Sequence, residues 1–198
     1  MKRVIFSLLL FTLAFSVPVG GAYPELSGVV PITAPDGQSF CTAFVINREE
    51  QLLLTADHCM GIPFAPFIDG VPAAEIYHDQ DLDVAVLKAP GLLPSRKELN
   101  YRVGLVFNED TLAYGYVDNQ LRILAGKLAV PTVWLSPESP MFTFYTPAAI
   151  SGMSGGPVMG ADNLVVAMNQ RAHPSVELSL SFNINEIAQT TEPYWGAE

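Results

Sequence analysis

The feature that most constrains the fold of this chain is a recurring pattern. Short runs of β-branched and aromatic residues end, one after another, at Gly, Pro, Asn or Asp. Few segments show a sustained helical period. The runs that we expect to form strands are residues 41–46, 51–55, 83–87, 101–107, 141–146, 163–168 and 178–182. Many short strands separated by turn residues predict an all-β sandwich or barrel.

The Pro- and Gly-containing stretch 90–100 interrupts this pattern midway and predicts a linker between two all-β halves. We place the halves at residues 23–95 and 96–198. In the second half, the residues on either side of Gly160–Asn163 predict a hairpin. A short terminal helix is expected near residues 185–190.

Composition limits the function classes. Apolar residues make up 49% of the 198 residues and charged residues 15%, which is ample for a core. The net charge is −10 and no basic cluster is present, so we expect no nucleic-acid partner. Two cysteines are too few for a disulfide scaffold or a four-cysteine zinc site, although they can form one bridge.

The N-terminus predicts export. Lys2 and Arg3 precede the apolar stretch Val4–Val17, and small residues follow up to Ala22. This pattern is typical of a secretory signal peptide, here residues 1–22. The alternative is an uncleaved membrane anchor, but Pro18 interrupts the stretch before the roughly 20 apolar residues that a spanning helix needs. We therefore expect a secreted or periplasmic protein without a membrane segment after cleavage.

Three short segments contain residues suited to catalysis, in the order His, Asp, Ser. They are Leu54–Cys59 (LTADHC), Asp81–Leu87 (DLDVAVL) and Ser151–Val158 (SGMSGGPV). A serine hydroxyl needs a neighbouring base to become a nucleophile, and the base needs a carboxylate on its other nitrogen. Gly152 lacks a Cβ, so the chain can turn sharply and direct the N–H groups of Gly152 and Ser154 into one pocket.

Together these segments resemble the chymotrypsin-like (trypsin-fold) serine endopeptidases. The motifs around His58 and Ser154 and the Val-Ala after Asp83 match that family, and Ala113–Tyr116 is similar to the opening strand of its second barrel. The resemblance implies two packed six-stranded antiparallel β-barrels with the active site in the cleft between them. It also implies His58 as general base, Asp83 as orienting carboxylate and Ser154 as nucleophile.

The same resemblance implies an oxyanion hole formed by the N–H groups of Gly152 and Ser154, and a disulfide between Cys41 and Cys59. Two departures from the family are clear. The 25 residues from His58 to Asp83 are a short spacing, which suggests a compact microbial or viral-type variant. Met153 stands where activatable members carry an aspartate, so we expect no zymogen step of that kind.

Several residues allow a second interpretation. Asp81 lies two positions before Asp83, so both would face the same side of a strand, but only Asp83 directly precedes Val-Ala. Asp79, Asp81 and Asp83 resemble the start of a calcium loop, yet the required Gly and Glu are missing. His78 and His173 lack ligand partners at usable spacing and are expected in exposed loops. No metal is expected.

The primary substrate pocket is expected to be uncharged. The position six residues before Ser154, where trypsin-type members carry an acidic residue, is Ala148, and no Asp or Glu lies between Met141 and Val158. A buried Lys or Arg of the substrate would lack a partner there. The pocket residues expected from the resemblance are Ala148, Ala149, Met168 and His173.

The sequence therefore predicts a secreted serine endopeptidase that acts on a protein or peptide substrate through an acyl-enzyme. We expect it to be monomeric and to need no cofactor. The alternative is a catalytically silent protein of the same fold that binds a peptide or protein partner.

Overall fold

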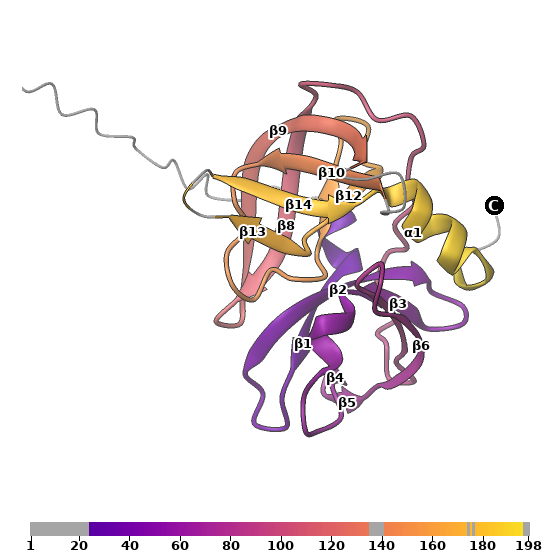
Figure 1. Ribbon diagram of the computed structural model, residues 1–198. Helices are drawn as coiled ribbons and strands as arrows, with labels where there is room; N and C mark the ends of the chain where they lie inside the picture. Colours follow the sequence, from indigo (N-terminus) through magenta and orange to yellow (C-terminus); the bar gives the residue numbers. More distant parts are fainter. Residues whose placement is uncertain (1–23, 135–140, 174, 176, 196–198) are drawn as a thin grey trace, which may run out of the picture.

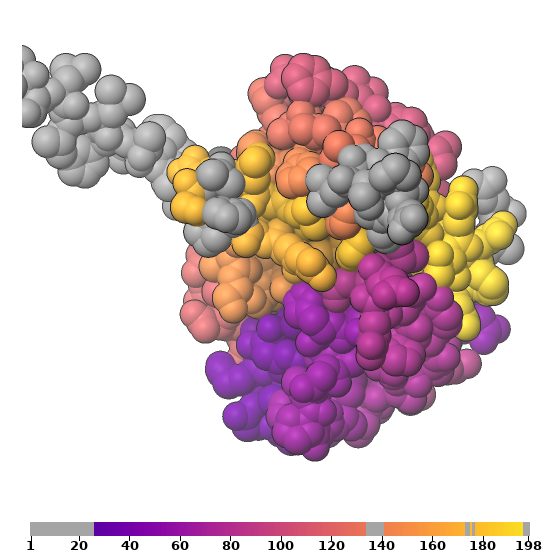
Figure 2. Space-filling view, viewed as in Figure 1, coloured from indigo at the N-terminus to yellow at the C-terminus, as the bar shows by residue number. Residues whose placement is uncertain are grey.

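A computed structural model describes residues 24–134, 141–173, 175 and 177–195 (Figure 1). The predicted signal peptide lies outside these residues. The described chain forms two curled antiparallel sheets of seven strands each. In Figure 2 the residues of the first half (indigo to magenta) and those of the second half (pink to yellow) form two adjoining bodies.

The first sheet has the strand order β5-β4-β1-β2-β3-β7-β6. Its strands are β1 (Val29–Thr33), β2 (Ser39–Asn47), β3 (Leu52–Thr55), β4 (Phe67–Ile68), β5 (Val71–Pro72), β6 (Ala74–Asp79) and β7 (Val84–Lys88). The short 3-10 helices η1 (Pro24–Gly28) and η2 (Asp57–Met60) lie before β1 and after β3.

The second sheet has the order β12-β11-β8-β9-β10-β14-β13. Its strands are β8 (Asp110–Val117), β9 (Gln120–Trp134), β10 (Met141–Thr146), β11 (Pro157–Met159), β12 (Val165–Met168), β13 (Arg171–His173) and β14 (Leu178–Phe182). The helices α1 (Ile184–Thr191) and η4 (Glu192–Tyr194) follow. Of the described helices, none has the length and apolarity that a bilayer span requires.

The strands β2, β3 and β7 in the middle of the first sheet are buried on both faces, which explains their nearly continuous apolar runs. In β2, Ala43 and Val45 pack in the interior of the first sheet, whereas Phe44 and Ile46 pack in a cluster shared with the second half. This alternation is the two-residue period of a strand. The shared cluster also contains Tyr114, Met168 and the α1 residues Ile184 and Ile187. It joins the two halves.

The two-body, all-β fold class is confirmed, with a small difference in strand count. Each sheet has seven strands where six were expected, and the edge strands are short: β5 has two residues and β13 has three. The predicted hairpin is present, because Met159 of β11 pairs with Val165 of β12. The predicted terminal helix is α1, whose first turn is capped by the side chain of Asn183.

One expectation about strands was wrong, and one long strand was not predicted. Residues 101–107 form no strand and contribute only an isolated bridge from Tyr101 to Val165. Conversely, β9 was not predicted, because Gly126 and Pro131 interrupt its pattern. Gly126 and Pro131 are both typical of a bent strand. A Cβ on Gly126 would lie 1.6 Å from the Thr146 carbonyl oxygen. The register between β9 and β10 shifts near Pro131.

Candidate active site

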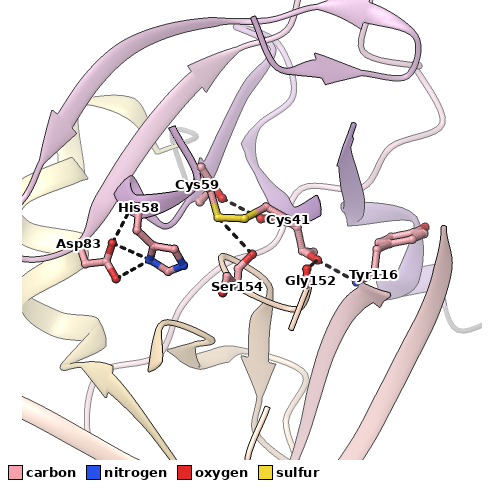
Figure 3. Close-up of a disulfide and its surroundings, with 9 residues drawn as sticks. Cys41, His58, Cys59, Asp83, Tyr116, Gly152 and Ser154 are labelled. Carbon is pink, nitrogen blue, oxygen red and sulfur yellow. Dashed lines mark hydrogen bonds and ion pairs between the residues drawn. A yellow bond between two sulfur atoms is a disulfide. The ribbon is translucent and has the colours of Figure 1, made fainter. Parts of the chain in front are cut away.

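The first half of the site is a histidine–carboxylate pair between two neighbouring strands. His58 lies in η2, directly after β3, and Asp83 immediately precedes β7. Because β3 and β7 pair with Thr55 opposite Ala85, these two ends lie next to each other. The Asp83 carboxylate accepts hydrogen bonds from the backbone N–H of His58 at 3.0 Å and from its Nδ1 at 2.9 Å (Figure 3).

Burial differs sharply between the two side chains. The Asp83 side chain is 7% exposed, whereas that of His58 is 45% exposed. A carboxylate bonded to Nδ1 leaves Nε2 as the nitrogen that can accept a proton. In Figure 3 the imidazole of His58 lies between Asp83 and Ser154. The arrangement has the features of a general base oriented by a buried carboxylate.

The structure distinguishes Asp83 from Asp81. Asp79 accepts hydrogen bonds from the N–H groups of Asp81 and Leu82, and these bonds form a turn before β7. The expectation that Asp81 and Asp83 share a strand face was therefore wrong, because both lie in this turn. Asp81 is exposed, while Asp83 adopts φ +50° and points toward His58.

The pKa of His58 is raised above its ordinary value. The largest cause is the hydrogen bond to Asp83, which stabilises the protonated imidazole. Burial and the positive charge of Arg171 lower this pKa, whereas the negative charge of Asp57 raises it. The surroundings of His58 thus include two opposing charges beyond its direct partner.

A disulfide connects Cys41 of β2 to Cys59 of η2, as the sequence resemblance implied. Both residues are buried. The bridge ties the turn that carries His58 to the neighbouring strand. The Cys59 sulfur also lies 3.8 Å from the carbonyl oxygen of Ser154, so the bridge borders both halves of the site (Figure 3).

The second half of the site is the loop between β10 and β11, which carries Ser154. The Ser154 carbonyl accepts a hydrogen bond from the Thr42 N–H at 2.8 Å, and the Gly155 N–H donates to the Asn169 carbonyl at 2.6 Å. Gly155 has φ +81°, and a Cβ there would lie 2.1 Å from Thr55 Oγ1. Glycine is required at this position for both backbone conformation and space.

Two N–H groups of this loop lack acceptors. Within the described part of the chain, neither the Gly152 nor the Ser154 N–H makes a hydrogen bond, and Ser154 Oγ makes none to His58. The Met153 N–H donates to Ile150, closing a turn in which Gly152 has φ +97°. Free N–H groups beside a serine are what an oxyanion site needs, and nucleophile–base bonds are often long without substrate.

Met153 is fully buried in the apolar cluster inside the second sheet. It lies against Gly115, where a Cβ would come within 2.6 Å of Met153 Cα. An aspartate here would bury a charge among apolar side chains, so the Met153 side chain anchors the loop by packing.

A hollow of about 460 Å³ lies beside the histidine. It is lined by Asp57, His58, Gln80, Asp83, Gln170 and Arg171. Sequence reasoning did not select Gln170, whose side-chain amide donates to the carbonyls of Leu82 and Asp83 and so joins the second half to the carboxylate turn. Gln170 lies two residues after the end of β12, and no pattern in the sequence marked it.

Of the predicted pocket residues whose side chains the structure describes, Ala148, Ala149 and Met168, none lines this hollow. Ala148 and Ala149 are half-buried in the loop that carries Ser154, where the Ala149 N–H donates to Ser179 Oγ at 2.7 Å. Met168 is fully buried in the cluster that joins the two halves, so its side chain is not available to a substrate. His173 belongs to β13, but its side chain lies outside the described residues.

Among the described residues, possible metal ligands also gather at the surface near His78. Asp57, Glu75 and His78 each offer a ligand atom, and these atoms lie within 4.8 Å of one another at the surface. His78 lies in β6 rather than in a loop, and its Nδ1 is 3.1 Å from Asp57, so the expectation that it lacks partners was wrong. Cys41 and Cys59 are unavailable as ligands because they are bridged.

Comparison with known proteins identifies the family. The model of the trypsin-like peptidase domain matches residues 41–168, more than half of the chain, so the chain belongs to this family. A search of curated protein sequences finds no match.

Solved structures share the fold. The Rv3671c protease from M. tuberculosis, in its active form, superposes with a TM-score of 0.70 at 19% identity, covering 84% of this chain and 80% of that one. The MamO protease domain from Magnetospirillum magneticum gives 0.65 at 16% identity, covering 85% and 97%. The HtrA-type protease AlgW with a decapeptide gives 0.64 at 19% identity, covering 80% of this chain and 53% of AlgW.

Proposed function

We propose that this member of the trypsin-like peptidase family is an exported serine endopeptidase that hydrolyses peptide bonds through an acyl-enzyme. The observation that carries the proposal is the contact between His58 and the buried Asp83, with Nδ1 2.9 Å from the carboxylate. A buried carboxylate fixed on one nitrogen of an accessible histidine serves proton transfer at the other.

In the proposed reaction, Ser154 Oγ attacks the carbonyl carbon of the scissile bond while His58 Nε2 takes its proton. The imidazolium is stabilised by Asp83. His58 then gives the proton to the leaving amine, and the carbon–nitrogen bond breaks to leave the acyl group on Ser154. A water molecule, deprotonated by the same histidine, hydrolyses that ester and restores the serine.

The negative oxygen of each tetrahedral intermediate would be held by the N–H groups of Gly152 and Ser154. Both are unpaired within the described residues, so they are free to donate. Such donors stabilise the charge that develops during attack, and losing one typically lowers kcat about 10²- to 10³-fold.

The competing proposal is a silent protein of the same fold that only binds a peptide or protein. A binding role requires neither the buried Asp83 bonded to His58 nor the free N–H groups next to Ser154. These features favour catalysis. The AlgW structure contains a decapeptide, and a peptide chain is the substrate class that we propose here.

We further propose that the protein is exported and acts as a monomer without a cofactor. The predicted signal peptide and the Cys41–Cys59 bridge both favour an oxidising compartment.

Cleavage after apolar or small uncharged residues is the proposed specificity. Ala148 and Ala149 supply no charge, and Ser179, which binds the Ala149 N–H, is neutral. Cleavage sites in a denatured-proteome peptide library would test this. A dominant preference for Lys or Arg would contradict it.

Labelling with a fluorophosphonate tests the proposed activity directly. Protein beginning at Tyr23 should react with one equivalent, and the labelled peptide should contain Ser154. Ser154→Ala and His58→Ala should each lower kcat about 10⁴- to 10⁶-fold. Ser95→Ala, an exposed serine in the segment between the sheets, is the matched control and should react like wild type. Peptidase activity retained by pure Ser154→Ala protein would overturn the proposal.

A further inference from the structure

We propose that the hydroxyl of Thr42, a residue of the first sheet, is a positioning group for the oxyanion site in the second. The inference deepens the proposed function and rests on it. Thr42 lies near the start of β2, directly after the disulfide-bonded Cys41, and is completely buried.

The Thr42 hydroxyl donates one hydrogen bond to the second half of the molecule and accepts another from it. Oγ1 donates to the Gly152 carbonyl at 2.9 Å and accepts from the Tyr116 N–H at 2.8 Å. Gly152 belongs to the nucleophile loop and Tyr116 to β8. One hydroxyl therefore fixes the loop relative to the strand behind it.

The backbone of Thr42 holds the other end of the same turn. Its N–H donates to the Ser154 carbonyl at 2.8 Å, and its own carbonyl accepts from Thr55 Oγ1 at 2.7 Å. The register between β2 and β3 begins at Phe44, so the N–H of Thr42 lies beyond that pairing and is available to the loop.

These bonds act on the two residues whose N–H groups form the proposed oxyanion site. Thr42 donates hydrogen bonds to the carbonyl oxygens of Gly152 and Ser154. It therefore fixes the peptide group on the C-terminal side of each of these two residues. With these two peptide groups fixed, the turn has little freedom to rotate the N–H groups away. Preorganised donors of this kind cost no reorganisation when the charge develops.

The hydroxyl, rather than the bulk of the side chain, carries the argument. Valine has nearly the shape of threonine but would leave the Gly152 carbonyl and the Tyr116 N–H without their partner, and unpaired groups that lose solvent access are unfavourable. Serine keeps the oxygen and loses only a methyl group. The pair Thr42→Val and Thr42→Ser therefore separates hydrogen bonding from packing.

The test compares these variants on a peptide substrate and a peptide boronate, which mimics the tetrahedral state. We expect Thr42→Val to lower kcat about 10- to 100-fold, less than the loss of an oxyanion donor itself because both N–H groups remain, with KM changed less than about threefold. Boronate affinity should fall in parallel with kcat. Thr42→Ser should recover most of both.

Thr143→Val is the matched control. Thr143 is as buried as Thr42, and its hydroxyl donates to the Pro131 carbonyl at 2.8 Å, away from the site. We expect this variant to keep kcat while losing a comparable amount of thermal stability. A kcat equal to wild type in folded Thr42→Val, or an equal kcat loss in Thr143→Val, would overturn the inference.

A second readout does not depend on turnover. The NMR amide signals of Gly152 and Ser154 should shift or broaden in Thr42→Val, whereas the imidazole signals of His58 should not, because the Thr42 hydroxyl bonds to Gly152 and Tyr116 and not to the imidazole. Unchanged amide signals would overturn the inference about Thr42. Absence of fluorophosphonate labelling in wild type would instead overturn the proposed function, so the two failures are distinguishable.

Discussion

The two halves of the candidate site are held in place in different ways. In the first sheet, His58 is fixed by side-chain chemistry: Asp83 binds both its backbone and its ring, and the Cys41–Cys59 bridge ties down its turn. In the second sheet, the loop around Ser154 is fixed by hydrogen bonds to its backbone, including one from the Thr42 hydroxyl, and by glycines with positive φ.

This difference has a physical origin. A general base must keep one ring nitrogen bonded and the other accessible, which a neighbouring carboxylate achieves. An oxyanion site instead needs main-chain N–H groups that are aimed outward, and only the backbone conformation sets their direction. The first half should therefore be sensitive to the charge of side chains, and the second to added atoms.

The strongest test of the first half is Asp83→Asn. An amide keeps the shape but donates a proton where the ring must also donate, so His58 takes the wrong tautomer. By analogy with other triads, kcat should fall about 10⁴-fold with little change in fold. Asp81→Asn, two residues earlier and exposed, is the control and should keep its activity. Equal losses in the two variants would contradict the assignment of Asp83.

In the second half the matching change is Gly155→Ala. The added Cβ would meet Thr55 Oγ1 at 2.1 Å and the Thr42 carbonyl oxygen at 2.3 Å, and φ is +81°. Strain of about 1–2 kcal/mol and overpacking of about 1–3 kcal/mol should combine, and fluorophosphonate labelling should slow at least about tenfold.

Gly37→Ala is the control for Gly155→Ala. Gly37 has a similar φ of +85°, but a Cβ there meets nothing within 4 Å. It should therefore show the strain in thermal unfolding without any loss of labelling. Equal unfolding temperatures and equal labelling rates for the two variants would show that the close approach at Gly155 is unimportant.

Removal of the disulfide should have a smaller effect, mainly on stability. The cysteines are 18 residues apart, and a bridge over a loop of this size contributes about 3 kcal/mol. The variant Cys41→Ser/Cys59→Ser should then unfold roughly 6–12 °C below wild type. Intact-mass analysis of the wild type should show two alkylated cysteines only after reduction; free thiols in exported protein would contradict the bridge.

The sequence predicted the parts of the molecule that depend on local pattern. Strands such as 141–146 and 178–182 appear at the predicted residues because each is a short run of apolar and hydroxyl-bearing residues that no Gly or Pro interrupts. The segments around His58 and Ser154 were found because catalysis restricts both residue type and neighbours. Strand β9 was missed because the bend at Gly126 and Pro131 is stabilised by tertiary contacts with β10.

Residues that join the two halves left no sequence signal. Thr42 is an ordinary threonine in a strand, and Gln170 is a single glutamine after β12, yet each binds carbonyl groups more than 80 residues away in the chain. Such contacts depend on how the sheets pack. The charge environment of His58 was equally hidden, because Asp57 is adjacent in sequence but Arg171 comes from β13.

The smallest predicted effect tests whether the charged residues around His58 change its pKa. Only neutral His58 can accept the Ser154 proton, so kcat/KM should fall as pH decreases through the raised pKa of His58, above its ordinary 6.5. Arg171 lowers this pKa and Asp57 raises it. Arg171→Gln should thus move the acid limb to higher pH, and Asp57→Asn to lower pH. If both variants moved the acid limb in the same direction, a charge effect would be contradicted. Arg122→Gln, at an exposed arginine, is the control and should leave the acid limb unchanged.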